Sequence, residues 1–415
     1  MPNPKRRHSK TRTAKRRTHD ALTPIALGPC PQCRELKPPH IVCPTCGHYR
    51  GRQARAVKEE EPGSRDGVTE RSVRPRPLAI DAMGGDDAPA RVVEGALLAV
   101  RELGLALELV GPVVELEPRL AREPDRARLS ITLVDAPEHV GMADRPRDAL
   151  RKRATSIRVA VERVRTGEVS GLFSAGHTGA TVVAAVAGLG LLPGVERPAL
   201  AVTIPTARGQ AVLLDVGATV DCQPAHLRQF AAMGCAYAQV ALGRSAPRVG
   251  LLSIGEEALK GDQLTREAFR AIETSGLPFV GNVEACNLFD GDADVVVCDG
   301  FTGNIALKIS EGVVDAVAAM LREELAASAM TRFGAALARP AFRRFARRVD
   351  ASEFGGAPLL GVNGLCLVGH GRSSARAVRN GIALASRVAA ESLVPRLADA
   401  VARLTPCPSR GSLPS

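Results

Sequence analysis

The sequence predicts an α/β protein with a mostly parallel sheet, and two features carry that prediction. Val295–Val297 is a short β-branched run of the kind that buried parallel strands use, and a long apolar-periodic helix pattern follows it. The arrangement also recurs, because five apolar runs finish in glycine with a small polar or acidic residue, around positions 84, 176, 217, 255 and 303. The ends of parallel strands lie at one edge of a sheet, where ligands bind. We therefore expect one shared site at that edge.

Length and charge divide the chain into two parts. Its 415 residues have room for two or three domains, and a hydrophobic content of 45% is typical of a folded globular protein. Residues 1–76 hold 18 Lys and Arg against 7 Asp and Glu, so the whole formal net charge of +11 falls there. We expect the first part to bind a polyanion and the second to be a neutral domain. No segment reads as secretory or membrane-spanning, which predicts a cytoplasmic protein.

The first element in chain order is a basic arm. Eight of the first 17 residues are Lys or Arg, and the first acidic residue is Asp20. Such a segment cannot bury a core, and its charge suits a phosphate backbone. A localisation signal and a merely solvated run are the other interpretations of the arm taken alone.

Two CxxC pairs follow the arm. Cys30 and Cys33 form the first, Cys43 and Cys46 form the second, and nine residues separate the pairs. Four thiolates at this spacing are typical of a closed tetrahedral site for a structural Zn²⁺, and metal binding supplies most of the folding energy of so small a module. A redox role is disfavoured, because neither pair opens a helix after a strand.

Residues 1–53 as a whole resemble the bacterial large-subunit ribosomal protein family L-thirty-two. The resemblance lies in PKRRHSKTRTAKRRTHDAL, in the CPQC and CPTC pairs and in CGHYRGR. It implies that the arm binds ribosomal RNA, that the four cysteines hold zinc, and that the module enters ribosomes if it assembles. Residues 54–76 have few apolar side chains and mixed charge, which predicts a disordered linker, and residues 405–415 are expected to form a tail.

The second module, residues 77–404, resembles the PlsX phosphate acyltransferases. The motifs that carry the resemblance are DAMGGDDAP, FSAGHTGA, LLDVGATVD, GLLSIGEEALKG, DVVVCDGFTGN and GVNGLCLVGHGRSS. The resemblance implies a Rossmann-like three-layer α/β/α fold, a homodimer, and the conversion of acyl carrier protein thioester and phosphate into acyl phosphate and free carrier. The acyl phosphate would pass to a membrane glycerol-3-phosphate acyltransferase.

The residues at the strand ends fit such chemistry. Phosphate is already a nucleophile, so the protein must hold it against a thioester carbonyl and stabilise the developing oxyanion. We expect the unpartnered first-turn amides after Asp299 to hold the phosphate. The candidate catalytic residues are Lys308, His177, Asn304 and Asp299. No nucleotide-binding glycine motif is present, so we expect no organic cofactor.

A larger set is predicted to bind substrate. It comprises Asp81, Gly84, Gly85, Asp86, Gly176, Thr178, Gly179, Asp215, Gly217, Gly255, Glu256, Thr302, Gly303, Asn363 and His370. The three aspartates that end strands, at 81, 215 and 299, could instead only cap turns. Three positions depart from the family pattern: His177 and Thr219 stand where Asn is usual, and Cys286 stands where Arg is usual.

These observations leave three functional hypotheses. The first is a ribosomal zinc ribbon fused to a phosphate acyltransferase. The second is an enzyme of the same fold with different chemistry, such as a short-chain phosphotransacetylase. The third is a ribosomal protein whose second domain is inactive, and the three departures motivate it.

Two basic segments interrupt the second module. Met330–Val349 has six Arg and no acid, with apolar side chains near helical spacing. It predicts an amphipathic helix that contacts an anionic membrane, a second copy of the chain or an acidic carrier protein. The contact residues are Arg339, Phe342, Arg343, Arg344, Phe345 and Arg347. The second segment, Arg151–Arg153, could serve carrier or phosphate, or simply be a solvated helix start.

Overall fold

The structure, a computed structural model, describes residues 28–33, 36–37, 42–43, 48–49, 52–53, 76–349, 353 and 355–404. Its internal contacts divide the chain into two units, Met1–Val73 and Arg74–Ser415. The basic arm, Cys46, nearly all of the predicted linker and the tail lie outside the described residues.

The described residues of the first unit include two short antiparallel pairs of strands. β1 (Gly28–Pro29) pairs with β2 (Leu36–Lys37), and β3 (His48–Tyr49) pairs with β4 (Arg52–Gln53). Cys30 directly follows β1. The pair β1 and β2 therefore positions the first CxxC pair.

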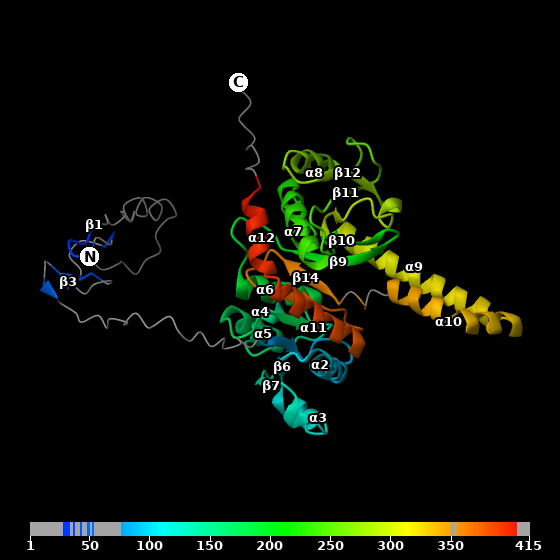
Figure 1. The fold of residues 1–415 in the computed structure, drawn as a ribbon, viewed down its shortest axis with the longest axis horizontal. Helices are drawn as coiled ribbons and strands as arrows, with labels where there is room; N and C mark the ends of the chain where they lie inside the picture. Colours follow the sequence, from blue (N-terminus) through cyan, green and yellow to red (C-terminus); the bar gives the residue numbers. More distant parts are fainter. Residues whose placement is uncertain are drawn as a thin grey trace, which may run out of the picture. The chain divides into compact units, whose positions relative to one another are not determined.

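The second unit is built on one eleven-stranded sheet (Figure 1). Its order is β12-β11-β13-β10-β9-β14-β15-β8-β5-β6-β7. In chain order the strands are β5 (Leu78–Asp81), β6 (Leu107–Gly111), β7 (Ile131–Asp135), β8 (Leu172–Ser174), β9 (Ala199–Thr206), β10 (Gly209–Leu214), β11 (Val249–Ser253), β12 (Phe279–Glu284), β13 (Val295–Val297), β14 (Ala357–Leu360) and β15 (Cys366–Val368).

The sheet holds two parallel groups that run in opposite directions. β15, β8, β5, β6 and β7 form one group, β10, β13, β11 and β12 form the other, and the antiparallel pairs of β9 and β14 join them. The prediction of a mostly parallel sheet is confirmed, but the expectation of one shared edge is wrong, because the five glycine turns divide between two groups. Neighbouring strands in a sheet are twisted by about 20–25° relative to each other. Five such steps separate β5 from β10, so the strands of the second group are rotated by roughly 100° or more relative to β5.

Helices cover both faces of the sheet (Figure 1). One face packs mainly on α2 (Ala90–Leu103), α3 (Val113–Leu120), α7 (Pro224–Leu242), α8 (Gln263–Glu273), α11 (Ala375–Ala390) and α12 (Leu393–Ala402). The other packs mainly on α4 (Asp148–Arg151), α5 (Ser156–Arg165) and α6 (Thr178–Leu189). Strand side chains alternate between the two cores, with Ile80 in one and Ala79 in the other. The fold is a three-layer α/β/α domain.

Local sequence signals set the helix ends. Asp262 and Ser374 cap α8 and α11 by accepting a first-turn amide, and Pro224 is the first residue of α7. Gly104 and Gly243 end α2 and α7 in the left-handed conformation. Two short 3-10 helices, η1 (Arg126–Arg128) and η2 (Ala285–Asn287), also lie in the described part of the chain.

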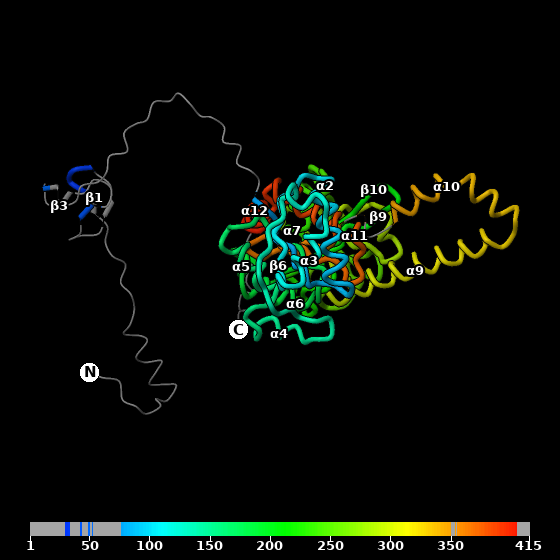
Figure 2. Tube along the Cα trace, turned by 90° about the horizontal axis from the view of Figure 1, so that it is seen from below, coloured from blue at the N-terminus to red at the C-terminus, as the bar shows by residue number. Residues whose placement is uncertain are grey.

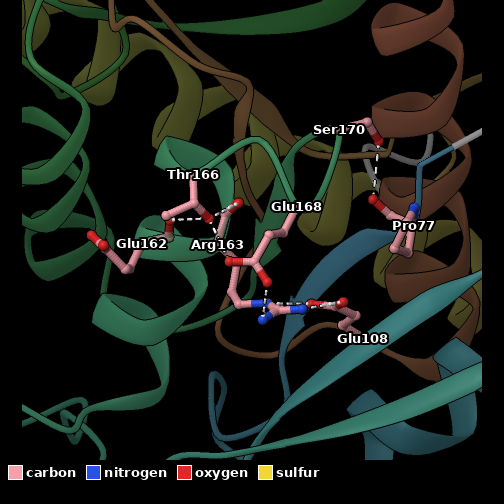
Figure 3. A network of polar contacts seen from close by, with 7 residues as sticks. All are labelled: Pro77, Glu108, Glu162, Arg163, Thr166, Glu168 and Ser170. Carbon is pink, nitrogen blue, oxygen red and sulfur yellow. Dashed lines mark hydrogen bonds and ion pairs between the residues drawn. The ribbon is translucent and has the colours of Figure 1, made fainter.

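A charged pair fastens α5 to the sheet (Figure 3). Glu108 on β6 is buried, and the Arg163 guanidinium donates to both of its carboxylate oxygens, at 2.8 and 2.6 Å. The carboxylate raises the pKa of Arg163, and Glu168 also pairs with that guanidinium. This bidentate geometry fixes the helix that begins beside Asp81.

Two long helices form a hairpin that extends away from the sheet, α9 (Gly300–Ala326) and α10 (Ala329–Val349) (Figure 2). Only Gly300 and Gly303 of α9 are buried, and α10 has no buried residue. Arg348 joins the end of α10 to the β9–β10 turn by donating to the carbonyls of Thr206 and Ala207 at 3.0 and 2.9 Å. Among the described residues, no helix is long and apolar enough to span a bilayer.

Candidate active site

The ends of β5 and β8 form a buried polar cluster. Asp81 and Ser174 lie opposite each other in the parallel register, and the Ser174 hydroxyl donates to Asp81 Oδ2 at 2.7 Å. The Gly176 amide donates to the Ser174 hydroxyl at 3.2 Å. Burial raises the pKa of Asp81, against the lowering effect of hydroxyl groups from Ser156 and Ser174. Asp81 therefore positions the turn that starts α6, by way of Ser174.

The turn after β5 packs directly on this cluster. A Cβ on Gly84 would lie 2.6 Å from the Gly176 amide nitrogen, so only glycine fits there. The turn also reaches the loop after β15, because the Asp86 amide donates to the Gly371 carbonyl at 2.8 Å. Three predicted segments, around positions 84–86, 174–179 and 369–371, are thus in mutual contact.

Asp215 organises the second parallel group. Its Oδ1 accepts from the amides of Leu200, Gly217 and Ala218 at 2.8, 3.1 and 3.0 Å, and its Oδ2 accepts from Thr219 at 2.6 Å. Burial raises the pKa of Asp215 to about 6, although these amides act in the opposite direction. All its contacts are with backbone, so the capping interpretation describes this carboxylate.

The N-terminus of α9 differs from our expectation. Its four leading amides are all occupied: Gly300 donates to the Thr219 carbonyl at 2.9 Å, Phe301 and Thr302 to Asp299 Oδ1 at 3.0 and 2.9 Å, and Gly303 to the Asp299 carbonyl at 3.0 Å. A Cβ on Gly303 would come within 1.9 Å of the Asp215 carbonyl oxygen. The prediction of unpartnered amides at this helix is wrong, because Asp299 caps it.

The N-terminus of α6 is more open. His177 caps it through Nδ1, which accepts from the Ala180 amide at 3.4 Å, and Thr181 donates to the His177 carbonyl at 3.0 Å. The amides of Thr178 and Gly179 have no acceptor within residues 76–349. First-turn amides of this kind attract anions, and no acidic residue lies in the first turn.

Lys308 and His370 form a contact between segments that belong to the two parallel groups of strands. Lys308 lies on α9, one turn after Asn304, and its Nζ is 3.1 Å from Nε2 of His370, which follows β15. Lys308 also pairs with Glu311 at 3.0 Å. Partial desolvation and then the Lys308 charge lower the pKa of His370. The imidazole is therefore neutral near pH 7 and can accept from the ammonium.

The remaining predicted site residues lie in other parts of the second unit than the Lys308–His370 contact. Asn304, beside Gly217, and Thr302 are exposed on α9. Gly255 and Glu256 follow β11 at the same edge as Asp215, and Glu256 accepts from Asn287 at 3.0 Å. Asn363 is not part of the group, because it lies in the β14–β15 turn at the end of β15 opposite to His370 and bonds the Gly190 carbonyl.

The structure adds two residues to the site and clarifies two others. Ser174 and Glu311 were not predicted, since their roles depend on strand register and on helix spacing around Lys308. Thr219 fits its position, as its hydroxyl donates to the Pro198 carbonyl at 2.8 Å. Cys286 is exposed beside Asn287.

The predicted contact residues of the hairpin lie on α10. Phe342 is partly exposed, and the other five, Arg339, Arg343, Arg344, Phe345 and Arg347, are exposed. The hydrogen bonds at the end of α10 run from Arg348 to the β9–β10 turn. The helix itself was predicted correctly.

The cysteine cluster in the first unit fits a metal. The ligand sulfurs of Cys30, Cys33 and Cys43 all lie within 4.8 Å of one another, and Cys33 Sγ is 3.6 Å from Cys43 Sγ. Two sulfurs at about 2.3 Å from a tetrahedral Zn²⁺ are separated by roughly 3.8 Å. Cys46, the fourth predicted ligand, lies outside the described residues.

Comparisons with known proteins divide the chain in the same way. Residues 77–396 match the family described as "Fatty acid synthesis protein", and residues 2–57 match the "Ribosomal L32p protein family". A phosphate acyltransferase of Acidobacterium capsulatum is 48% identical over 315 residues, which cover 76% of this chain and 92% of that protein. One from Koribacter versatilis is 50% identical over 336 residues, 79% of this chain and 92% of that protein.

A solved structure shares the fold. A phosphotransacetylase from Streptococcus pyogenes aligns with a TM-score of 0.52 at 19% identity, over 77% of this chain and 95% of that chain. At this identity the likeness concerns the arrangement of helices and strands.

Proposed function

The chain belongs to the fatty acid synthesis protein family, and from this premise we propose that residues 77–404 form a phosphate acyltransferase. Its substrates would be inorganic phosphate and an acyl thioester of acyl carrier protein. The observation that carries the proposal is the Lys308–His370 contact, because it places a cation from one parallel group beside the glycine turns of the other.

The proposed reaction needs no covalent enzyme intermediate. An oxygen of the phosphate dianion forms a bond to the thioester carbonyl carbon, the C–S bond breaks, and the sulfur takes up the proton that the phosphate loses. The products are acyl phosphate and a thiol. The protein has to hold the dianion in line with the carbonyl and stabilise the oxyanion that forms during attack.

The geometry assigns these tasks to particular groups. The open amides of Thr178 and Gly179 at the start of α6 suit the phosphate, and the Lys308 ammonium supplies the positive charge. Neutral His370 orients that ammonium. Asp81 and Asp215 act as positioning residues, since their carboxylates bind Ser174 and backbone amides.

The test is a thiol-release assay on the purified full chain. Long-chain acyl carrier protein, acetyl-CoA or no thioester is supplied with and without phosphate, and hydroxylamine traps acyl phosphate. We expect phosphate-dependent release with the carrier substrate. Release from acetyl-CoA alone would favour the short-chain phosphotransacetylase, and release from neither would favour an inactive domain.

We also propose that the first unit is a ribosomal zinc ribbon. The family match over residues 2–57 and the three clustered cysteines support Zn²⁺ binding, and the basic arm suits ribosomal RNA. Metal analysis of the purified chain should find one Zn²⁺ per protein. A Cys33→Ser variant should hold less.

The hairpin supports a homodimer. Its apolar side chains recur every fourth residue on α9, with exposed fractions of 42% for Ile305, 61% for Ile309, 55% for Val313 and 52% for Val317. An apolar stripe of this length needs a partner. Sedimentation should show a dimer that Ile309→Asp with Val313→Asp converts to monomer, and an unchanged dimer would refute this contact.

We further propose a cytoplasmic protein that associates peripherally with membrane, where a glycerol-3-phosphate acyltransferase could take up the acyl phosphate. The exposed arginines of α10 support this, since they suit anionic headgroups. Vesicle flotation should recover the wild type but not a variant carrying Arg343→Glu, Arg344→Glu and Arg347→Glu.

A further inference from the structure

A second basic surface lies beside the candidate active site. Residues 139–153, which we call the basic loop, form most of the connection between β7 and α5 and include α4. Glu138, just before them, accepts from the Ala154 amide at 3.1 Å. The loop carries five cationic side chains against two acidic ones: Arg145, Arg147, Arg151, Lys152 and Arg153 against Asp144 and Asp148.

The two acidic side chains are used inside the loop. Asp144 accepts from the Gly141 amide at 3.0 Å and pairs with Lys152 at 3.3 Å, and these contacts lower its pKa. Asp148 accepts from the Arg145 amide at 3.1 Å and lies 3.8 Å from the Arg151 guanidinium. The loop is thereby folded into a defined shape while most of its positive charge faces solvent.

All four arginines of the basic loop are exposed, and only Arg151 lies near a carboxylate, that of Asp148. The side chain of Arg151 is 80% exposed, and the side chains of Arg145, Arg147 and Arg153 have no carboxylate partner within residues 76–349. Two exposed apolar side chains, Met142 and Leu150, stand among them. A positive surface with apolar side chains in it fits a negatively charged protein helix.

The loop contacts the segments that form the site. Pro146 Cγ would lie 3.0 Å from a Cβ on Gly179, and Met142 Cε would lie 2.9 Å from one on Gly371. Its last turn leads to Ser156, which hydrogen-bonds the Asp81 carboxylate. The loop thus borders both the open amides of α6 and the His370 loop, whereas the described contacts of α10 are with α9 and the β9–β10 turn.

We propose that the basic loop is the docking surface for the acidic carrier protein that delivers the acyl thioester. This inference rests on the proposed function. Docking at the loop places the carrier next to the start of α6, where the phosphate is proposed to bind. The arginines of α10 are then not the carrier contact.

The test compares three variants of the full chain, each with three arginines changed to glutamate. The first carries the changes at Arg145, Arg147 and Arg153, the second at Arg343, Arg344 and Arg347 on α10, and the third at the exposed Arg119, Arg122 and Arg403. Kinetics are measured with acyl carrier protein and with phosphate. Anisotropy of a labelled carrier reports binding without turnover.

For the basic-loop variant we expect KM for the carrier substrate to rise about tenfold or more, with kcat and KM for phosphate within about twofold. The other two variants should match wild type. Added salt should weaken carrier binding in wild type more than in the basic-loop variant. Glutamine replacements at the same three positions remove the positive charge without reversing it. They should raise KM for the carrier substrate by a smaller factor, and they serve as the variant to measure if the glutamate changes unfold the loop.

An α10 variant that weakens carrier binding, while the basic-loop variant does not, would overturn the inference. Unchanged anisotropy in all three variants would do so too. If wild type binds the carrier but makes no acyl phosphate, the proposed function fails while the docking surface stands.

Discussion

Protonation of His370 controls its contact with Lys308. Partial desolvation and the adjacent ammonium lower the imidazole pKa below its ordinary value of 6.5, so the ring is neutral at pH 7. A neutral ring accepts from Lys308 through Nε2, whereas a protonated ring repels it. The contact is therefore present above the folded pKa and lost as pH falls through it.

This residue gives the first prediction. In wild type, kcat/KM for the phosphate dianion, corrected for the protonation of phosphate itself, should fall on the acid side at a pH below 6.5. His370→Gln keeps an acceptor but cannot titrate there, so the acid limb should flatten with a modest loss of rate. A variant whose acid limb matches that of wild type would show that another group titrates.

Asp215 should couple stability to pH. Its folded pKa of about 6 lies above the ordinary value of 3.8, so its stabilising effect is complete below 3.8 and is lost as pH rises through 6. Two pKa units correspond to about 3 kcal/mol. Asp215→Asn destabilises the protein because its side-chain amide faces the Thr219 amide, and the loss should be largest at acidic pH, where the wild-type carboxyl stabilises most.

Urea unfolding of wild type and Asp215→Asn at about pH 4 and 7.5 measures this effect. The gap in unfolding free energy should narrow toward pH 7.5, by up to roughly 3 kcal/mol. A gap that stays constant with pH would mean that Asp215 is ionised throughout.

At the scale of elements, α5 contains two arginine–carboxylate pairs that should differ in strength. Arg163 holds the buried Glu108, whose side chain is 7% exposed, whereas Arg165 and Glu162 are 55% and 54% exposed. Arg163→Met leaves a buried carboxylate unpaired and should cost about 3–5 kcal/mol. Arg165→Met should cost far less, because water screens an ion pair between two exposed side chains. Equal losses of unfolding free energy in urea for the two variants would contradict this difference between the buried and the exposed pair.

The elements also show what could be predicted from sequence. The strand–turn–helix pattern identified β5, β8, β10, β11, β13 and the helix at α10, because hydrophobic period and glycine turns are local signals. The opposite directions of the two parallel groups could not be predicted, since strand order is set by packing across the whole domain. For the same reason the sequence could not show that Asn363, in the β14–β15 turn, lies at the end of β15 opposite to His370.

The sequence pattern also could not predict which first-turn amides of a helix have hydrogen-bond acceptors. Asp299 and His177 both precede glycine-containing helix starts, yet Asp299 caps α9 with two hydrogen bonds to one oxygen while His177 leaves two amides of α6 open. The difference depends on which amides each capping side chain can contact. It also depends on the Thr219 carbonyl, which accepts from the Gly300 amide of α9 although the two residues are far apart in sequence. Only the folded arrangement shows which helix can take an anion.

At the scale of the whole molecule, the chain divides into two units with separate proposed chemistry, and both hydrophobic core clusters of the described residues lie in the second unit. Zinc removal should therefore unfold the ribbon and leave acyl transfer within about 20% of its rate, since the site is formed within residues 81–371. Chelation followed by the thiol-release assay checks this, with circular dichroism as the control for metal loss. A large loss of activity on chelation would mean that the ribbon supports the second unit.

The claim that the site is assembled across two halves of one sheet is tested most directly by a double-mutant cycle. Lys308→Met, His370→Gln and the double variant are compared for kcat/KM toward phosphate. If the two side chains act as one unit, the double variant should be no more than about threefold worse than Lys308→Met alone. Effects that multiply would show that the residues act independently and would contradict this assembly.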